Sequence, residues 1–157
     1  MTSPELSDWP VSDRRYRRSE ASAVVGHGDA VWERATRGVL RWQVKTASGF
    51  AVDSTGPVSE GDRVVVTARV LALSVVEPVE VAAVVKEVDR VGFAYRTLPG
   101  HPVSGEEAFI VHRRGDEVRL TVRSLTRSAP QQPWRALYPL LLIAQRIARR
   151  RYLRSLR

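Results

Sequence analysis

Cysteine is absent from this chain of 157 residues. Its absence excludes thiol nucleophiles, cysteine-ligated zinc, iron–sulfur clusters and any disulfide framework. A chain of this length buries enough surface to fold as one domain without such cross-links. Because a protein without disulfides suits a reducing compartment, we expect a cytoplasmic location.

Long apolar runs are also missing. No stretch approaches the roughly 18 residues needed to cross a bilayer, and the first residues lack the basic and apolar segments of a signal peptide. Histidine is scarce, and His27, His101 and His112 have spacings that give no ligand set, so we expect no metal. Nucleotide-binding and phosphate-binding motifs are absent, and we expect no cofactor.

Lysine is nearly absent as well, since only Lys45 and Lys86 occur among 25 basic residues. A bias toward arginine, with abundant Ala, Val and Gly, is typical of a GC-rich bacterium. The excess positive charge lies at one end: residues 118–157 hold ten arginines and no acidic residue. Such a segment is either a solvated helix face or a surface for an anionic partner. Aromatic residues are not interleaved with the arginines, which argues against nucleic acid, whereas peripheral membrane contact stays open.

Polarity and spacing divide the chain into a polar arm, residues 1–12, and a single domain, residues 13–157. A first strand is predicted at 16–23 and a helix from Asp29 to about Trp42. From Phe50 to Thr126 the apolar period is two, and the short gaps between strands predict antiparallel neighbours. The expected strands are 50–53, 63–73, 79–88, 91–98, 106–112 and 117–126, separated by turns that include Glu77-Pro78.

A long helix is predicted from Trp134 to Arg157, with Pro139 kinking its first turns. The arginines gather on one side of this helix and an apolar stripe lies on the opposite side. Leu142 and Ile143 do not belong to the stripe. We expect that stripe to be buried and the first half of the helix to be covered by the sheet, a second subunit or a membrane surface. The stripe consists of Leu137, Leu140, Leu141, Ala144, Ile147, Ala148 and Tyr152.

This order of elements predicts an α+β fold in which a curved antiparallel sheet of about six or seven strands wraps the long C-terminal helix, with one short helix near the N-terminus. The order resembles the helix-grip fold of START and Bet v 1-like proteins. That resemblance implies an apolar cavity between the sheet and the helix.

The segment from Gly92 to Phe109 is the most distinctive. It resembles the signature of a family of bacterial and plant domains of unknown function, in which Gly-Phe-x-Tyr-Gly-Thr-Leu runs into Pro-Gly-His-Pro and then Gly-Glu-Glu-x-Phe. Arg96 departs from the pattern, because it stands where the family has glycine.

Alternation along the strands predicts which side chains face the cavity. Glu107, Tyr95 and His101 are the candidate catalytic residues. The alternatives are that Glu107 orders the adjacent turn and that His101 is structural. The expected ligand-binding residues are Phe93, Thr97, Phe109, Ser124, Thr126 and Trp42, with Arg96 at the rim.

An apolar wall with a few polar points is typical of a small-molecule pocket. We therefore expect binding of a hydrophobic ligand, a lipid or polyketide-like metabolite, with cofactor-independent cyclase or isomerase catalysis left open. An interaction module that places its basic helix on an anionic surface is the alternative. A ligand-free domain that dimerises through the Leu140–Ile143 ridge is a third, and both monomer and homodimer remain open.

Overall fold

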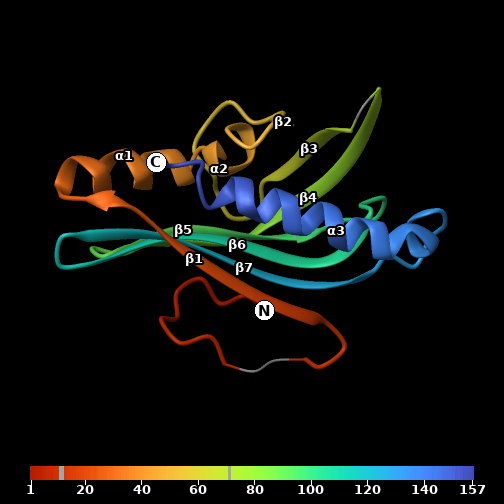
Figure 1. The fold of residues 1–157 in the computed structure, drawn as a ribbon, viewed down its shortest axis with the longest axis horizontal. Helices are drawn as coiled ribbons and strands as arrows, with labels where there is room; N and C mark the ends of the chain where they lie inside the picture. The colour runs from red at the N-terminus through yellow and green to blue at the C-terminus, as the bar shows by residue number, and fades with distance from the viewer. Residues whose placement is uncertain (11–12, 71) are drawn as a thin grey trace.

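An antiparallel sheet of seven strands, in the order β1-β7-β6-β5-β4-β3-β2, forms the body of the protein. The structure, a computed structural model, describes residues 1–10, 13–70 and 72–157. Consecutive strands from β2 to β7 are neighbours, and β1 closes the row beside β7 (Figure 1). The strands are β1 (Arg17–His27), β2 (Phe50–Val52), β3 (Arg63–Val70), β4 (Leu73–Lys86), β5 (Arg90–Thr97), β6 (Val103–Arg114) and β7 (Glu117–Ser128).

The strand β4 differs most from its expectation, since it begins at Leu73 and passes straight through the predicted turn at Glu77-Pro78. Pro78 pairs with Val65 in the register, and its carbonyl still accepts a bond from the backbone N–H of Leu98 at 2.9 Å. The strand therefore tolerates the missing N–H of the proline. The predicted turn was wrong, and its correction places Glu77 inside the sheet rather than in a loop. Residue 71, which falls within the strand expected at 63–73, lies outside the described residues.

Two helices lie near the N-terminus, α1 (Asp29–Val39) and α2 (Gln43–Thr46). The helix predicted from Asp29 to about Trp42 ends at Val39, and Trp42 follows with a left-handed backbone conformation, φ of 61°. The chain then turns immediately into α2, an element that the sequence analysis did not predict. This break aims the next helical turn at the inner face of the sheet.

The core fills one end of the space between these helices and the sheet. Trp42 is 1% exposed, and its ring meets that of Phe93 edge-on at 4.7 Å. Phe93 in turn contacts Phe109 at 5.8 Å between ring centroids. Valines of β3, β4 and β7 complete this cluster, so the sheet is firmly packed here.

The helix α3 (Trp134–Tyr152) crosses the same face of the sheet at its other end. Its predicted apolar stripe is only partly buried: Leu140 remains 62% exposed and Ile147 49% exposed, whereas Tyr152 is buried. The expectation of a fully buried stripe was wrong, because this side of the helix faces an open hollow. No helix in the described parts of the chain combines the length and the apolarity needed to span a bilayer.

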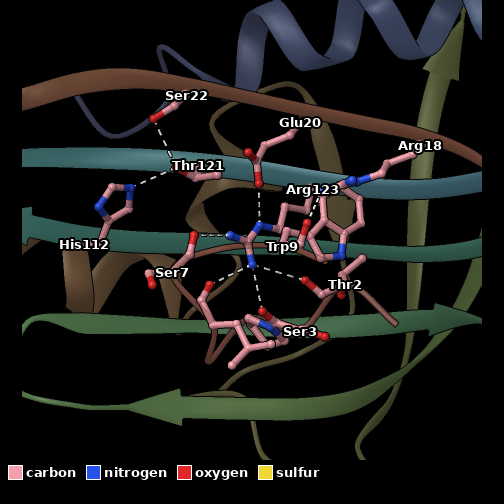
Figure 2. A network of polar contacts seen from close by, with 12 residues as sticks. Thr2, Ser3, Ser7, Trp9, Arg18, Glu20, Ser22, His112, Thr121 and Arg123 are labelled. Carbon is pink, nitrogen blue, oxygen red and sulfur yellow. Dashed lines mark hydrogen bonds and ion pairs between the residues drawn. The ribbon is translucent and has the colours of Figure 1, made fainter. Parts of the chain in front are cut away.

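The outer face of the sheet carries residues 1–10, which we expected to form part of a loose arm and which instead pack against β7 (Figure 2). Arg123 is 2% exposed and donates to the backbone carbonyls of Ser3, Leu6 and Ser7 at 2.7 to 3.0 Å. Its Nε also contacts Glu20 at 2.6 Å. This segment therefore seals the outer face with its own backbone. Residues 11 and 12 of the expected arm lie outside the described residues.

Candidate functional site

A cavity of about 450 Å³ opens between α3, the β3–β4 hairpin and the inner face of the sheet. This volume lies in the range of small-molecule sites. Figure 1 shows α3 and the hairpin on the same side of the sheet, opposite the N-terminal segment. Much of the wall is apolar and includes Ala68, Val70, Val75, Leu141, Ala144 and Ile147.

A lysine stands at the inner end of this cavity. Lys45 of α2 is 3% exposed and its Nζ donates to the Tyr152 hydroxyl at 2.8 Å. The same ammonium lies 3.3 Å from Glu107 Oε2 and 4.0 Å from Glu77 Oε2. Its Nζ is also 4.7 Å from the centre of the Phe50 ring and 5.0 Å from that of Tyr152. Carboxylates and aromatic faces together compensate for the loss of water around this charge.

Strand register assembles the rest of the cluster. Tyr95 of β5 pairs with Glu107 of β6, which pairs with Ser124 of β7. Residues opposite one another in antiparallel strands point to the same face, so all three side chains reach the cavity. The Tyr95 hydroxyl donates to Glu107 Oε2, the oxygen that also faces Lys45. Glu107 is therefore a bridge between a phenol and an ammonium.

The protonation of the cluster follows from burial and charge. Burial alone would lower the pKa of Lys45, but its interactions with Tyr152, Tyr95 and the nearby carboxylates raise it well above its usual range. Burial likewise raises the pKa of Tyr152 and Tyr95, and it raises that of the Glu77 carboxyl. At neutral pH the inner end of the cavity therefore presents a charged ammonium together with two neutral phenols.

His101 contributes a neutral imidazole. Burial, with the charge of Lys45 as a second cause, lowers its pKa to about 3. Its Nδ1 accepts the backbone N–H of Val103 at 3.1 Å, so the neutral ring carries its proton on Nε2, which lies 4.0 Å from Glu77. His101 thus adds a donor on the cavity side without adding charge.

The structure brings most of the predicted polar residues together. Glu107 and Tyr95 meet in the cluster, and the other inner-face positions form the adjoining wall. Two of these hydroxyls already hold partners, since Thr97 accepts the backbone N–H of Gly105 and Ser124 bonds to Arg149. The predicted residues that line the cavity are Tyr95, Thr97, His101, Glu107, Ser124 and Thr126.

Four predicted ligand-binding residues lie elsewhere. Trp42, Phe93 and Phe109 belong to the packed core and are not part of the cavity wall. Arg96 is on the outer face, where it bonds to Glu80, because alternation along β5 turns it away from Tyr95. Arg96 therefore does not line the cavity, whereas Arg69 and Arg151 do.

Sequence reasoning missed Lys45 and Glu77 and assigned Tyr152 only to the apolar stripe. One signal was available for Lys45, which is one of two lysines among 25 basic residues. Glu77 was hidden because its proline neighbour suggested a turn. Tertiary packing alone brings these two residues, far apart in the sequence, to one end of the cavity.

Solved structures of other proteins share this architecture. A hypothetical protein from Helicobacter pylori is 12% identical and has a TM-score of 0.62 over 98% of this chain and 97% of its own. A protein from Thermus thermophilus is 11% identical, with a TM-score of 0.60 over 90% and 93%. Major latex-like protein 151 from Panax ginseng is 15% identical, with a TM-score of 0.51 over 87% and 98%. The fold is therefore the helix-grip fold of Bet v 1-like proteins, as predicted.

Sequence comparison is more specific. A UPF0548 protein from Deinococcus radiodurans is 35% identical over 162 residues, which covers 95% of this chain and 78% of the relative. The family described as "Domain of unknown function (DUF1990)" matches residues 2–155. With nearly its whole length matched, and with the predicted resemblance confirmed, the chain belongs to the DUF1990 family.

Proposed function

We propose that this protein binds an apolar small molecule in the cavity, with an acceptor oxygen of the ligand directed at Lys45. The observation that carries the proposal is a buried, protonated lysine at the inner end of a mainly apolar hollow of about 450 Å³. Apolar walls hold a ligand by burial, and a few placed polar groups orient it. A lipid or a polyketide-like metabolite combines the two features.

The charge balance of the cluster favours a neutral acceptor. Lys45 already faces Glu107, and Glu77 adds a second acidic group 4.0 Å away. A ligand carboxylate would therefore meet carboxyl groups as well as the ammonium. A carbonyl or hydroxyl oxygen accepts hydrogen bonds from Lys45 without adding a negative charge.

We extend the proposal to proton transfer of the cyclase or isomerase type. Glu107 is the base, which takes a proton from the carbon next to the ligand carbonyl. Tyr95 positions Glu107 through its hydroxyl hydrogen bond, Lys45 stabilises the oxyanion that forms, and Glu107 returns the proton to another carbon, so no cofactor is needed. Tyr95→Phe should abolish turnover while the melting temperature stays nearly unchanged. Glu107→Gln should abolish turnover as well but lower the melting temperature, because the buried Lys45 loses its nearest ion-pair partner. If both variants unfold, their role is architectural.

Cavity binding is tested by filling the hollow. Ala136 and Ala144 are both exposed on α3, but only Ala144 is among the residues that line the cavity. Ala144→Trp should lower the affinity for anilinonaphthalene sulfonate at least tenfold, and Ala136→Trp should leave it unchanged, as measured by fluorescence titration. Native mass spectrometry should likewise find an apolar compound on the purified wild-type protein and not on Ala144→Trp. Equal binding by the two variants would contradict the proposal.

The polar end is tested with a pair of competitors, a long-chain methyl ketone and the alkane of equal length. Wild-type protein should bind the ketone about tenfold more tightly, which corresponds to one charge-assisted hydrogen bond of about 1.5 kcal/mol. Lys45→Met should bind both competitors equally. Since both are measured by displacement of the same dye, their ratio does not depend on the affinity of the variant for the dye. A preference that survives in Lys45→Met would remove Lys45 from the site.

A further inference from the structure

Five large apolar side chains stand exposed around the mouth of the cavity. Val70 and Leu73 pair at the tip of the β3–β4 hairpin, and Leu73 is 71% exposed. Leu140, Ile143 and Ile147 follow the helical repeat along one edge of α3, and Ile143 is 53% exposed. Single exposed apolar residues are ordinary, but a group around one opening marks an interaction surface. We call these five residues the mouth patch.

Both halves of the mouth patch border the same opening. Val70 of the hairpin and Ile147 of α3 line the cavity together, so the two groups flank its entrance. The hairpin and the helix lie on the side of the sheet opposite residues 1–10 (Figure 1). The N-terminal segment therefore covers the outer face and leaves the mouth patch open.

Positive charge surrounds the mouth patch. Arg146 and Arg150 are exposed along the flank of α3, next to Ile143 and Ile147 in the helical repeat, and Arg154 is exposed in the turn that follows the helix. Arg69 is exposed beside Val70 on the hairpin. Because residues 118–157 contain no acidic residue, nothing on α3 itself neutralises this field.

We propose that the mouth patch docks on an anionic lipid surface, with the hairpin tip and the α3 edge in the interfacial region and the arginines on the lipid headgroups. An apolar surface ringed by arginines matches the chemistry of such an interface. In a dimer formed through the mouth patch, the arginines of one copy would face those of the other. Nucleic acid would bind the arginines but would not bury the five apolar side chains. An anionic lipid surface can thus bind both the apolar side chains of the mouth patch and the arginines around it.

Docking would turn the entrance of the cavity toward the hydrocarbon. An apolar ligand then passes between the bilayer and the cavity without crossing water. Surface binding itself needs no ligand in the cavity, so this inference goes beyond the proposed function and fails or holds separately from it.

The experiment is co-sedimentation with phosphatidylcholine vesicles, with and without phosphatidylglycerol. The wild-type protein should bind only the anionic vesicles, and binding should be lost at about 0.5 M salt, where exposed charges are screened. Leu73→Asp/Ile143→Asp should weaken binding at least tenfold. The matched control, with the same two added charges, is Leu6→Asp/Val88→Asp, because Leu6 is 41% exposed in the N-terminal segment and Val88 is 82% exposed at the turn between β4 and β5.

The charge requirement has its own matched pair. Arg146→Glu/Arg150→Glu/Arg154→Glu should abolish binding, since each juxtamembrane arginine contributes about fivefold. Arg34→Glu/Arg37→Glu/Arg41→Glu changes the net charge equally through exposed residues of α1 and the turn after it, and should retain most of the binding. Loss in both triple variants would reduce the effect to net charge and overturn the proposal.

Three further outcomes would also overturn it. The first is failure of the wild-type protein to bind anionic vesicles. The second is duplex DNA binding that the arginine triple abolishes and Leu73→Asp/Ile143→Asp does not. The third is a dimer in light scattering that Leu73→Asp/Ile143→Asp dissociates, because the mouth patch would then belong to a second copy. Vesicle binding by Ala144→Trp should persist, which separates this result from that of the cavity.

Discussion

Both faces of the sheet bury cationic side chains, but the groups that accept hydrogen bonds from these cations differ between the two faces. On the outer face, Arg123 donates to backbone carbonyls of the N-terminal segment (Figure 2). Arg90 donates in the same way to the carbonyls of Pro4 and Leu6. On the inner face, the ammonium of Lys45 contacts side chains, namely a phenol, two carboxyl groups and aromatic rings.

The difference lies in what covers each charge. Backbone carbonyls of residues 1–10 close over Arg123. Lys45 is equally shielded by protein atoms, yet it borders a cavity of about 450 Å³. A cation fixed by backbone carbonyls holds two parts of the chain together. A cation that is held by side chains beside a cavity remains available to a ligand.

Neutralising the Arg123–Glu20 ion pair on the outer face should have the largest effect on the free energy of unfolding. Arg123→Met/Glu20→Gln removes three hydrogen bonds from Arg123 to the carbonyls of Ser3, Leu6 and Ser7, at about 1 kcal/mol each. The Ser3 and Leu6 carbonyls each keep one other donor, the backbone N–H of Leu6 and the guanidinium of Arg90 respectively. We expect the free energy of unfolding, measured in urea, to fall by about 3 kcal/mol.

The control is a second arginine–glutamate pair on the sheet, Arg63→Met/Glu80→Gln. Arg63 has a side chain that is 76% exposed and bonds to no backbone carbonyl among the described residues. This variant should lose less than about 1 kcal/mol. Equal losses in the two variants would show that the backbone contacts of Arg123 contribute nothing.

Acid should destabilise the inner face through His101. Its pKa is about 3 in the folded protein and about 6.5 in an unfolded chain. Between these values the unfolded state binds a proton that the folded state does not, so stability falls as the pH is lowered. From pH 7 to pH 5 the loss should be about 2 kcal/mol.

His101→Gln should remove this part of the pH dependence, as measured by urea unfolding at both pH values. Glu77 works in the opposite direction, because its raised pKa stabilises the folded state as the pH falls. Since Glu77 is present in both proteins, its contribution cancels in the comparison. If the free energy of unfolding fell equally from pH 7 to pH 5 in wild type and in His101→Gln, His101 would not be buried as a neutral ring.

The contrast between the two faces also marks the limit of sequence prediction. Period two from Phe50 to Thr126 and the long final helix were enough to predict the helix-grip fold. Alternation correctly placed Tyr95 and Glu107 on the inner face, because side-chain direction in a strand depends only on parity. Such local rules carry over directly into the structure.

Residues whose position depends on distant packing escaped prediction. Lys45 lies on a four-residue helix that exists because Trp42 breaks the chain direction. Trp42 itself was placed at the cavity, but aromatic packing draws it into the core. The N-terminal segment looked unstructured because its contacts with Arg123 and Arg90 use backbone carbonyls, which leave no trace in the sequence. Trp9 was an available signal, since it is 7% exposed and its ring packs against Arg18 and Arg123.

Neutralising the Lys45–Glu107 ion pair on the inner face should have the smallest effect on the free energy of unfolding. In Lys45→Met/Glu107→Gln the aliphatic stem of Lys45 is kept, and the amide at 107 can still accept the Tyr95 hydrogen bond. Burying a charge pair is expensive, so replacing both partners with neutral groups is often neutral or stabilising. We expect the free energy of unfolding to stay within about 1 kcal/mol of wild type or to rise, while the preference for the ketone over the alkane disappears. A loss as large as that of Arg123→Met/Glu20→Gln would mean that Lys45 is architectural, and the two faces of the sheet would then differ only in which atoms hold their cations.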